Sequence, residues 1–285
     1  MTVGEALAEA GAKLVENRES ARRDAGVLLA HVLARPTAWL LAYGDAVLGD
    51  DSVARYREAI GRRSAGEPVA YIIGEAGFYG RTFAVTPDVL VPRPETEALI
   101  TLALQAFAFV DRPIRVCDVG TGSGAIAITL AAERPRASVV AIDASAPALT
   151  VAARNATAHG VSERMTFRLE DALNELEPGM VFDAIVANLP YVRSADLAAA
   201  PDPTSFEPRL ALDGGPDGLG AYRKLLRRAP EHLAANGLLL LEAGPDTVDE
   251  LASLAHSAFE GICRVRAVRD YAGLRRVVEL RATPG

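Results

Sequence analysis

The residues best suited to chemistry are four that follow an apolar run: Asn188, Leu189, Pro190 and Tyr191. The preceding residues, 181–187, are mostly apolar and β-branched, which predicts a buried parallel strand. The carboxyl end of such a strand is where ligands bind in an α/β sheet. Asn188 offers a side-chain carbonyl, Leu189 a backbone carbonyl that Pro190 helps to orient, and Tyr191 an aromatic face. Two adjacent acceptors suit a planar NH₂ group, because each N–H can donate to one oxygen.

A glycine-rich turn provides a second candidate site. The predicted strand 114–119 leads into a turn of small residues and then into a predicted helix; the turn comprises Gly120, Thr121, Gly122, Ser123 and Gly124. Glycines at this place let the backbone approach a ligand closely. Their spacing differs from the Gly-X-Gly-X-X-Gly fingerprint of dinucleotide sites, so we do not expect a dinucleotide.

Two acids follow the next two predicted strands. Asp143 lies about 20 residues beyond the glycines, where an acid can accept both ribose hydroxyls. Asp171 ends the third strand and can accept an adenine amino group in the same manner. Either acid alone could be a solvated loop residue, but the ordered set resembles the S-adenosylmethionine site of Rossmann-like methyltransferases.

Periodicity predicts three parts of the chain. We expect a small helical bundle over 1–73, a β-hairpin linker over 74–93 that the apolar run 71–73 introduces, and an α/β domain over 94–285. The α/β domain is predicted to be a seven-stranded, doubly wound sheet with helices on both faces. Its predicted strands are 114–119, 138–142, 165–169, 182–187, 238–242, 262–268 and 275–280.

Composition narrows the classes of protein. The chain has 285 residues, a net charge of -7 and no basic block, so we expect no direct nucleic-acid partner. The two cysteines, Cys117 and Cys263, have neither metal nor disulfide spacing and favour a reducing cytoplasm. Glu5 and Glu9 disfavour a secretory signal, and no uninterrupted apolar stretch is long enough to cross a membrane.

Several motifs resemble those of one enzyme family. Asn-Leu-Pro-Tyr at 188–191 is similar to the Asn-Pro-Pro-Tyr signature of methyltransferases that alkylate amide or exocyclic amino nitrogens. Further segments resemble successive signatures of the peptide-chain release factor glutamine N5-methyltransferases. These segments are 66–72, 89–97, 118–124, 206–208, 214–219 and 269–271. The match covers nearly the whole chain, from the helical segment 24–31 to the C-terminal strands.

The resemblance implies an activity and a set of site residues. The substrate would be the glutamine of the Gly-Gly-Gln motif in class I release factors, the methyl donor S-adenosylmethionine and the product S-adenosylhomocysteine. The residues implied to bind the cofactor are Gly120, Thr121, Gly122, Ser123, Gly124, Asp143, Asp171, Ala172 and Asn188. Asn188, Leu189, Pro190 and Tyr191 would hold the glutamine. Two positions depart from the family: Leu189 replaces a proline, and Ala172 stands where many relatives have an aromatic residue.

Catalysis is expected to depend on positioning and electrostatics, without a metal. The Asn188 and Leu189 oxygens would hold the amide nitrogen in line with the methyl group, while Tyr191 packs against the glutamine. Glu95 and Glu97 could border the cofactor pocket, or simply cap a helix. We expect a monomer with a helical recognition domain. Two alternatives stay open: the same chemistry on a ribosomal-protein glutamine or a nucleobase amine, and a non-catalytic binding module.

Overall fold

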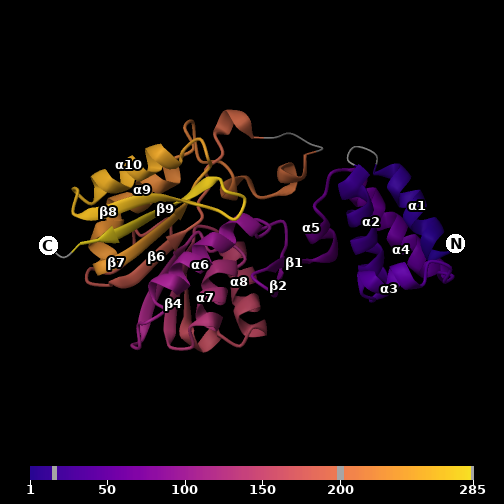
Figure 1. Cartoon of the computed structure of the whole chain (residues 1–285), viewed down its shortest axis with the longest axis horizontal. Coiled ribbons are helices and arrows are strands. Elements are labelled where there is room, and N and C mark those ends of the chain that lie inside the picture. The colour runs from indigo at the N-terminus through magenta and orange to yellow at the C-terminus, as the bar shows by residue number, and fades with distance from the viewer. Residues whose placement is uncertain (15–17, 198–201, 284–285) are drawn as a thin grey trace. The chain divides into compact units, whose positions relative to one another are not determined.

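The computed structural model describes residues 1–14, 18–197 and 202–283, and it divides into two compact units (Figure 1). The first unit combines Met1–Glu75 with Ala198–Phe206. The second combines Ala76–Leu197 with Glu207–Gly285. Within the described residues, no helix is long and apolar enough to cross a membrane.

The first unit is built from helices, as predicted. Its α-helices are α1 (Val3–Lys13), α2 (Arg18–Leu33), α3 (Thr37–Ala42), α4 (Asp50–Ser64) and α5 (Val69–Ile73), and the 3₁₀ helix η4 is Pro203–Phe206. Thr2 and Glu5 form the expected capping box at the start of α1. The apolar faces of these helices enclose a separate core whose largest members are Leu28, Tyr56 and Ile60. Burial of that core accounts for the helical region.

The prediction that the apolar run 71–73 opens the hairpin was wrong. These residues form α5, and Gly74, whose φ of 80° is left-handed, ends the helix. A short apolar run is compatible with either a strand or a buried helical turn, and here the glycine terminates a helix. The hairpin itself is confirmed, with strands β1 (Glu75–Phe78) and β2 (Arg81–Ala84).

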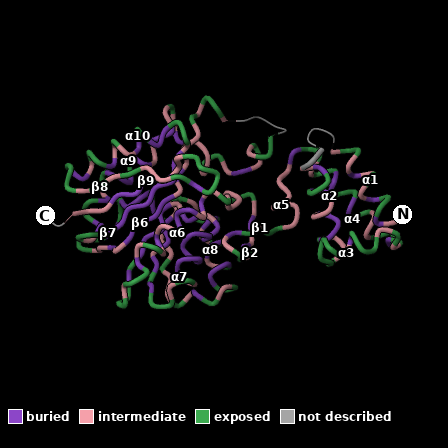
Figure 2. The backbone as a smooth tube through the Cα atoms, viewed as in Figure 1, coloured by how far each residue is buried: buried purple, intermediate pink, exposed green. Residues whose placement is uncertain are grey.

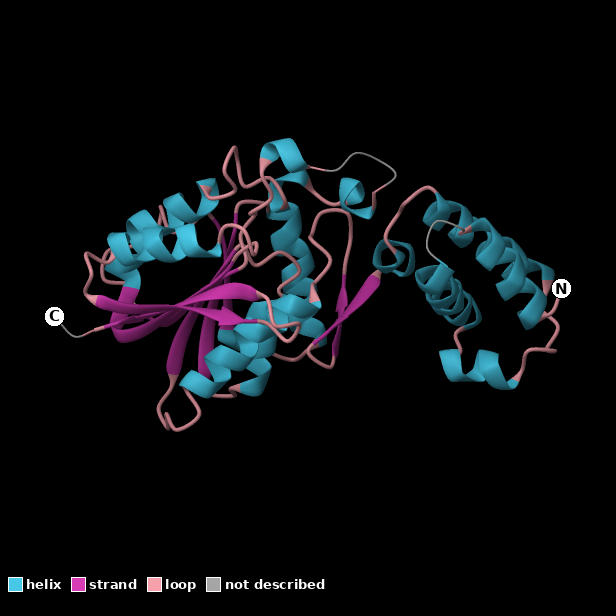
Figure 3. Ribbon diagram, turned by 45° about the horizontal axis from the view of Figure 1, so that its top comes forward, coloured by secondary structure: helices cyan, strands magenta, loops and turns pink. Residues whose placement is uncertain are grey.

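The second unit contains the predicted sheet, whose strands are magenta in Figure 3. The sheet has seven strands in the order β5-β4-β3-β6-β7-β9-β8. Its strands are β3 (Ile114–Val119), β4 (Ala137–Asp143), β5 (Met165–Leu169), β6 (Phe182–Ala187), β7 (Leu233–Glu242), β8 (Cys263–Arg269) and β9 (Arg275–Ala282). The first five strands pair in parallel, and β9 pairs antiparallel with both β7 and β8. All seven predicted strands are present, although β7 starts five residues earlier than predicted.

Helices cover both faces of this sheet (Figure 1). They are α6 (Glu97–Ala106), α7 (Ala125–Glu133), α8 (Ala146–Ala158), α9 (Gly220–His232) and α10 (Val248–Ala258), with short 3₁₀ turns η1 (Pro94–Thr96), η2 (Ser162–Arg164), η3 (Ser194–Asp196) and η5 (Arg209–Ala211). In β7, Leu238 and Leu240 join the core with α6 and α7, whereas Leu239 and Leu241 join the core with α9 and α10. This alternation buries the central strands on both sides, which explains their continuous apolar runs (Figure 2).

Candidate active site

Four parallel strands end at one edge of the sheet. Val119 of β3 lies between Ile142 of β4 and Ala187 of β6, and Asp143 is paired with Leu169 of β5. After β3, the next two strands, β4 and β5, are added on one side of the sheet, and from β6 onward the strands are added on the other side. A topological switch point therefore lies between β3 and β6. A cavity of about 430 Å³ opens at this edge, within the second unit. The predicted site residues that line it are Gly120, Thr121, Gly122, Ser123, Asp143, Asp171, Ala172, Asn188, Leu189 and Pro190.

The glycine turn has the backbone that only glycine adopts readily. Gly120, Gly122 and Gly124 have φ values of 75°, 54° and 81°. A Cβ on Gly120 would lie 2.8 Å from Leu189 Cδ2, so the turn after β3 and the loop after β6 are in close contact. A Cβ on Gly124 would lie 2.7 Å from Ile128 Cδ1. Gly124 therefore permits packing beneath the turn and is not one of the residues that line the cavity.

A buried carboxyl group supports the turn from below. The Thr121 hydroxyl donates to Asp118 Oδ2 over 2.7 Å, and the Ala127 N–H donates to the same oxygen over 3.2 Å. Burial raises the pKa of Asp118 to about 7, while these two hydrogen bonds act in the opposite direction. Asp118 thus ties the strand, the turn and the start of α7 together.

Asp143 lies in the wall of the cavity, as predicted. Its Oδ2 accepts the Gly122 N–H at 2.8 Å, and its Oδ1 accepts the Ser145 N–H at 2.9 Å. Burial raises its pKa, and these backbone hydrogen bonds lower it. Each carboxylate oxygen has a second lone pair, so Asp143 can still accept ligand hydroxyl groups.

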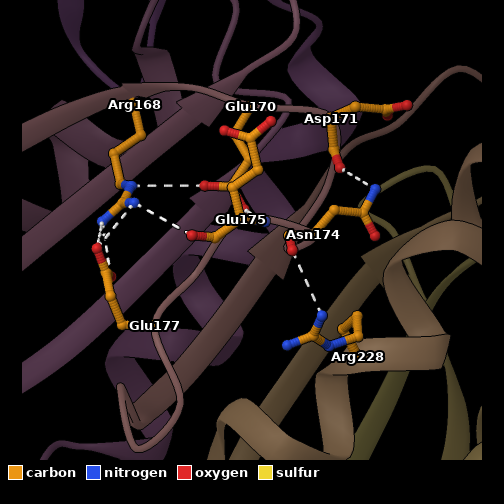
Figure 4. A network of polar contacts seen from close by, with 7 residues as sticks. All are labelled: Arg168, Glu170, Asp171, Asn174, Glu175, Glu177 and Arg228. Carbon is orange, nitrogen blue, oxygen red and sulfur yellow. Dashed lines mark hydrogen bonds and ion pairs between the residues drawn. The ribbon is translucent and has the colours of Figure 1, made fainter.

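The loop after β5 forms another wall (Figure 4). Asp171 lines the cavity, but its half-exposed carboxylate pairs with Lys224 Nζ at 2.6 Å. Its neighbour Glu170 is buried, and Glu170 Oε1 accepts the Glu175 N–H at 2.7 Å. Ala172 takes a left-handed φ of 61° within this loop, so its conformation depends on the surrounding contacts.

The loop after β6 is held by two hydroxyl groups. Asn188 Nδ2 donates to Thr96 Oγ1 over 3.0 Å, which leaves Asn188 Oδ1 for the role of acceptor. The Leu189 N–H donates to the hydroxyl of Tyr222 over 3.1 Å, and that hydroxyl also lies 3.1 Å from the Leu189 carbonyl oxygen. The Tyr222 hydroxyl also makes a short hydrogen bond to the carbonyl of Glu242.

Tyr191 differs from the other three members of the tetrapeptide. It is not among the residues that line the cavity, and its hydroxyl donates to Glu242 Oε1 over 3.4 Å. Burial and the neighbouring carboxylate raise its pKa to about 12. Its ring lies beside Gly244, where a Cβ would be 3.6 Å from Tyr191 Cδ2. The contact between Tyr191 and a glutamine substrate remains a prediction.

The long segment after Tyr191 packs closely on the site. The Gly214 N–H donates to the Val192 carbonyl over 2.8 Å, and a Cβ on Gly214 would lie 2.7 Å from the carbonyl oxygen of Pro190. Glu207 accepts the Val91 N–H over 3.0 Å and pairs with Arg93. These contacts give Gly214 and Glu207, from the segments 214–219 and 206–208 that resemble family signatures, a structural role beside the cavity.

Sequence analysis missed three supporting residues. Thr96 lies inside the segment 89–97, between Glu95 and Glu97, which were the predicted candidates there. Neither acid lines the cavity, and Glu97 accepts the Tyr79 N–H over 2.8 Å. Glu242 ends a predicted strand, as Asp143 does, and could have been found by that signal. Tyr222 lies in an ordinary amphipathic helix, and no local pattern marks it.

Comparisons with known proteins cover both units. Residues 5–74 match the family described as the PrmC N-terminal domain, and residues 111–263 match the methyltransferase domain family. A methyltransferase structure from Pyrococcus furiosus superposes with a TM-score of 0.52 at 17% identity, over 83% of this chain and 100% of that chain. At that identity the superposition indicates the fold alone.

Two curated relatives are similar over most of their length. The release factor glutamine methyltransferase of Cereibacter sphaeroides is 45% identical over 265 residues, which cover 92% of each chain. That of Moorella thermoacetica is 42% identical over 277 residues, which cover 97% of each chain. Identity at this level over nearly the full chain includes the helical region, the cavity and the C-terminal strands. This chain belongs to the family of release factor glutamine methyltransferases.

Proposed function

We propose that this chain is an S-adenosylmethionine-dependent protein-(glutamine-N5) methyltransferase. Its substrate is the side-chain amide of the glutamine in the Gly-Gly-Gln motif of class I release factors. The observation that carries the proposal is the loop after β6, where the Asn188 amide nitrogen is engaged by Thr96 at 3.0 Å and its oxygen is left for a substrate N–H. The family relatives support the choice of a glutamine amide over another planar NH₂ group.

The cavity suits the methyl donor. Gly120 and Gly122 line it with left-handed backbones that leave no side chain in the way of a ligand, and the Asp143 carboxylate has free lone pairs for ribose hydroxyls. We assign Asp171 and Ala172 to the adenine end, where Lys224 would have to share the Asp171 carboxylate. When bound, S-adenosylmethionine supplies an electrophilic methyl group; the product is S-adenosylhomocysteine.

The chain contributes position and charge to the reaction. An amide nitrogen is a weak nucleophile because its lone pair is delocalised into the carbonyl group. Asn188 Oδ1 and the Leu189 carbonyl accept its two N–H groups, hold the nitrogen in place and increase its electron density. The buried Leu189 side chain excludes water beside them. After transfer, the surplus proton leaves to solvent, so no general base is required.

The remaining assignments are part of the same proposal. Residues 1–73 form a substrate-recognition domain, 74–93 a linker and 94–285 the catalytic domain. The partner is a protein and not a nucleic acid or membrane, the chain acts as a monomer, and no metal takes part. Both cysteines are free thiols, which supports a cytoplasmic location.

Transfer of labelled methyl groups tests this function. The purified chain is incubated with labelled S-adenosylmethionine and a class I release factor, beside a release factor whose Gly-Gly-Gln glutamine is replaced. Label on the natural factor alone is the expected result. Label on neither, with cofactor binding intact, would overturn the release-factor assignment and favour a ribosomal-protein or nucleobase target. Failure to bind the cofactor would favour a binding module.

A further inference from the structure

Thr96 joins the 3₁₀ turn η1 to the helix α6. Its backbone is already helical, with φ of -65° and ψ of -19°, so its hydroxyl is not placed to accept a backbone N–H of the first turn of α6. The Thr96 side chain makes no such bond. It is 4% exposed, and its hydroxyl instead accepts the Asn188 amide N–H at 3.0 Å. A buried hydroxyl that bonds to a residue 92 positions away indicates a role beyond its own helix.

A buried acid orients the Thr96 hydroxyl. Glu242, which is 1% exposed and ends β7, faces Thr96, whose hydroxyl lowers the pKa of this carboxyl group. When Glu242 is ionised it only accepts hydrogen bonds, so the single hydroxyl hydrogen of Thr96 then points toward Glu242. The oxygen of the Thr96 hydroxyl then acts only as an acceptor toward Asn188. Asn188 can donate to it only through its NH₂ group.

The direction of the Asn188 amide decides what a substrate meets. With Nδ2 on Thr96, Oδ1 is the atom left for the substrate NH₂ group. In the reverse orientation, Oδ1 would face the Thr96 lone pairs, and the Asn188 NH₂ would face the substrate NH₂, donor against donor. The side-chain shape is nearly the same in both orientations, so packing alone cannot choose between them.

We propose that Thr96 is a positioning residue that, with Glu242 behind it, holds the Asn188 amide with its oxygen toward the substrate nitrogen. The inference rests on the proposed function, because it assumes that Asn188 Oδ1 accepts a substrate N–H. It adds a specific purpose for the threonine between Glu95 and Glu97, and for the acid at the end of β7.

Substitutions at Thr96 separate hydroxyl chemistry from shape. Thr96→Val keeps the shape and removes the hydroxyl, and we expect kcat for methyl transfer to fall about 10-fold to 100-fold. Affinity for S-adenosylmethionine, measured by calorimetry, should change by less than about 2-fold, because Asn188 is displaced and the glycine turn is not. Thr96→Ser restores the hydroxyl and should return kcat to within about 3-fold of the wild type.

The chain offers a matched control. Thr129 in α7 is also buried, but its hydroxyl has no hydrogen-bond partner among the residues that the structure describes. Thr129→Val therefore makes the same chemical change without breaking a contact, and kcat should stay within about 2-fold. Thr96→Val is also combined with Asn188→Ala. In the Asn188→Ala background, Thr96→Val should have no further effect on kcat, because both substitutions remove the same Thr96–Asn188 hydrogen bond.

The outcomes distinguish this inference from the proposed function. No transfer by the wild type would overturn the proposed function. Transfer by the wild type together with full-rate Thr96→Val, or an equal loss of kcat in the Asn188→Ala background, would overturn only the role of Thr96. Should Thr96→Val fail to fold, Thr96→Ser and Thr96→Ala are compared in its place. Equal kcat for these two folded variants would also contradict the role.

Discussion

The two halves of the cavity are built in different ways. In the cofactor half, short-range hydrogen bonds, such as Thr121 to Asp118 over 3 residues and Ser145 to Asp143 over 2, are combined with bonds between the ends of neighbouring strands, such as Gly122 to Asp143 over 21. In the substrate half, Asn188 to Thr96 spans 92 residues. Tyr191 to Glu242 spans 51, and Leu189 to Tyr222 spans 33. The cofactor half thus combines local turns with contacts between adjacent parallel strands, whereas the substrate half depends on the packing of elements far apart in the sequence.

This difference predicts how the two halves respond to mutation. Backbone N–H groups and glycine conformations hold the cofactor half, so damage there should weaken cofactor binding. Buried side chains from other elements hold the substrate half, so damage there should lower kcat and leave cofactor binding largely intact. Gly120 of the cofactor half and Leu189 of the substrate half are in contact. A substitution at this contact should therefore affect both cofactor binding and kcat.

The largest effect is expected at Asn188. Asn188→Ala removes the side-chain acceptor while leaving the glycine turn unchanged, so kcat should fall about 10²-fold to 10³-fold. Affinity for S-adenosylmethionine should change by less than about 2-fold. Labelled-methyl kinetics and calorimetry measure the two quantities. A loss of affinity as large as the loss of kcat would show that the halves are not separable at this residue.

Gly120→Ala should damage both halves together. The residue has a φ of 75°, and a Cβ would lie 2.8 Å from Leu189 Cδ2, so the turn or Leu189 must shift. We expect cofactor affinity and kcat each to fall by about 10-fold. Gly160→Ala is the matched control, because Gly160 has a φ of 68° with nothing within 4 Å of the added Cβ. Equal effects of the two substitutions would attribute the loss to backbone strain and not to the Leu189 contact.

Tyr222→Phe tests the support of Leu189 from α9. The change removes the hydroxyl that accepts the Leu189 N–H at 3.1 Å and leaves that buried group without its partner. The free energy of unfolding should drop by about 1–3 kcal/mol, with a several-fold loss of kcat. Urea unfolding and steady-state kinetics measure these effects. Wild-type kcat in a destabilised variant would mean that Tyr222 supports the fold but not the position of the Leu189 carbonyl.

The smallest effect concerns pH and Glu242. Burial raises the pKa of Glu242 to about 7, from an ordinary 4.5; the charged groups facing it are Arg276, which lowers the pKa, and Glu95, which raises it. Between these two pH values, the unfolded chain loses a proton that the folded chain retains, so this group makes the protein less stable as pH rises. Glu242→Gln removes that contribution.

Urea unfolding at pH 5 and pH 7.5 measures the change. Relative to the wild type, Glu242→Gln should gain stability at the higher pH. Asp118, whose pKa is also raised to about 7, is present in both proteins, so its contribution cancels in the comparison. An identical pH dependence in both proteins would contradict the raised pKa of Glu242.

Most of the fold could be predicted from sequence because the signals are local. The strands 114–119, 165–169 and 182–187 match the structure at both ends, since each is a short segment rich in apolar residues that stops at a glycine, an acid or an asparagine. The run 71–73 was assigned wrongly, because three apolar residues beside a glycine fit a helix end as well as a strand. The antiparallel pairing of β9 was not predicted, since no local pattern specifies a strand's neighbours.

The sequence by itself determined the glycine turn, the acid after β4 and the polar loop after β6, because the chemistry of each lies within a few consecutive residues. Only the tertiary structure decided that Thr96, Tyr222 and Glu242 meet behind that loop. It also joined the Tyr191 hydroxyl to Glu242, and Tyr191 is not among the residues that line the cavity. The physical reason is that hydrogen bonds between distant segments depend on strand order and helix packing, and neither is encoded in the spacing of neighbouring residues.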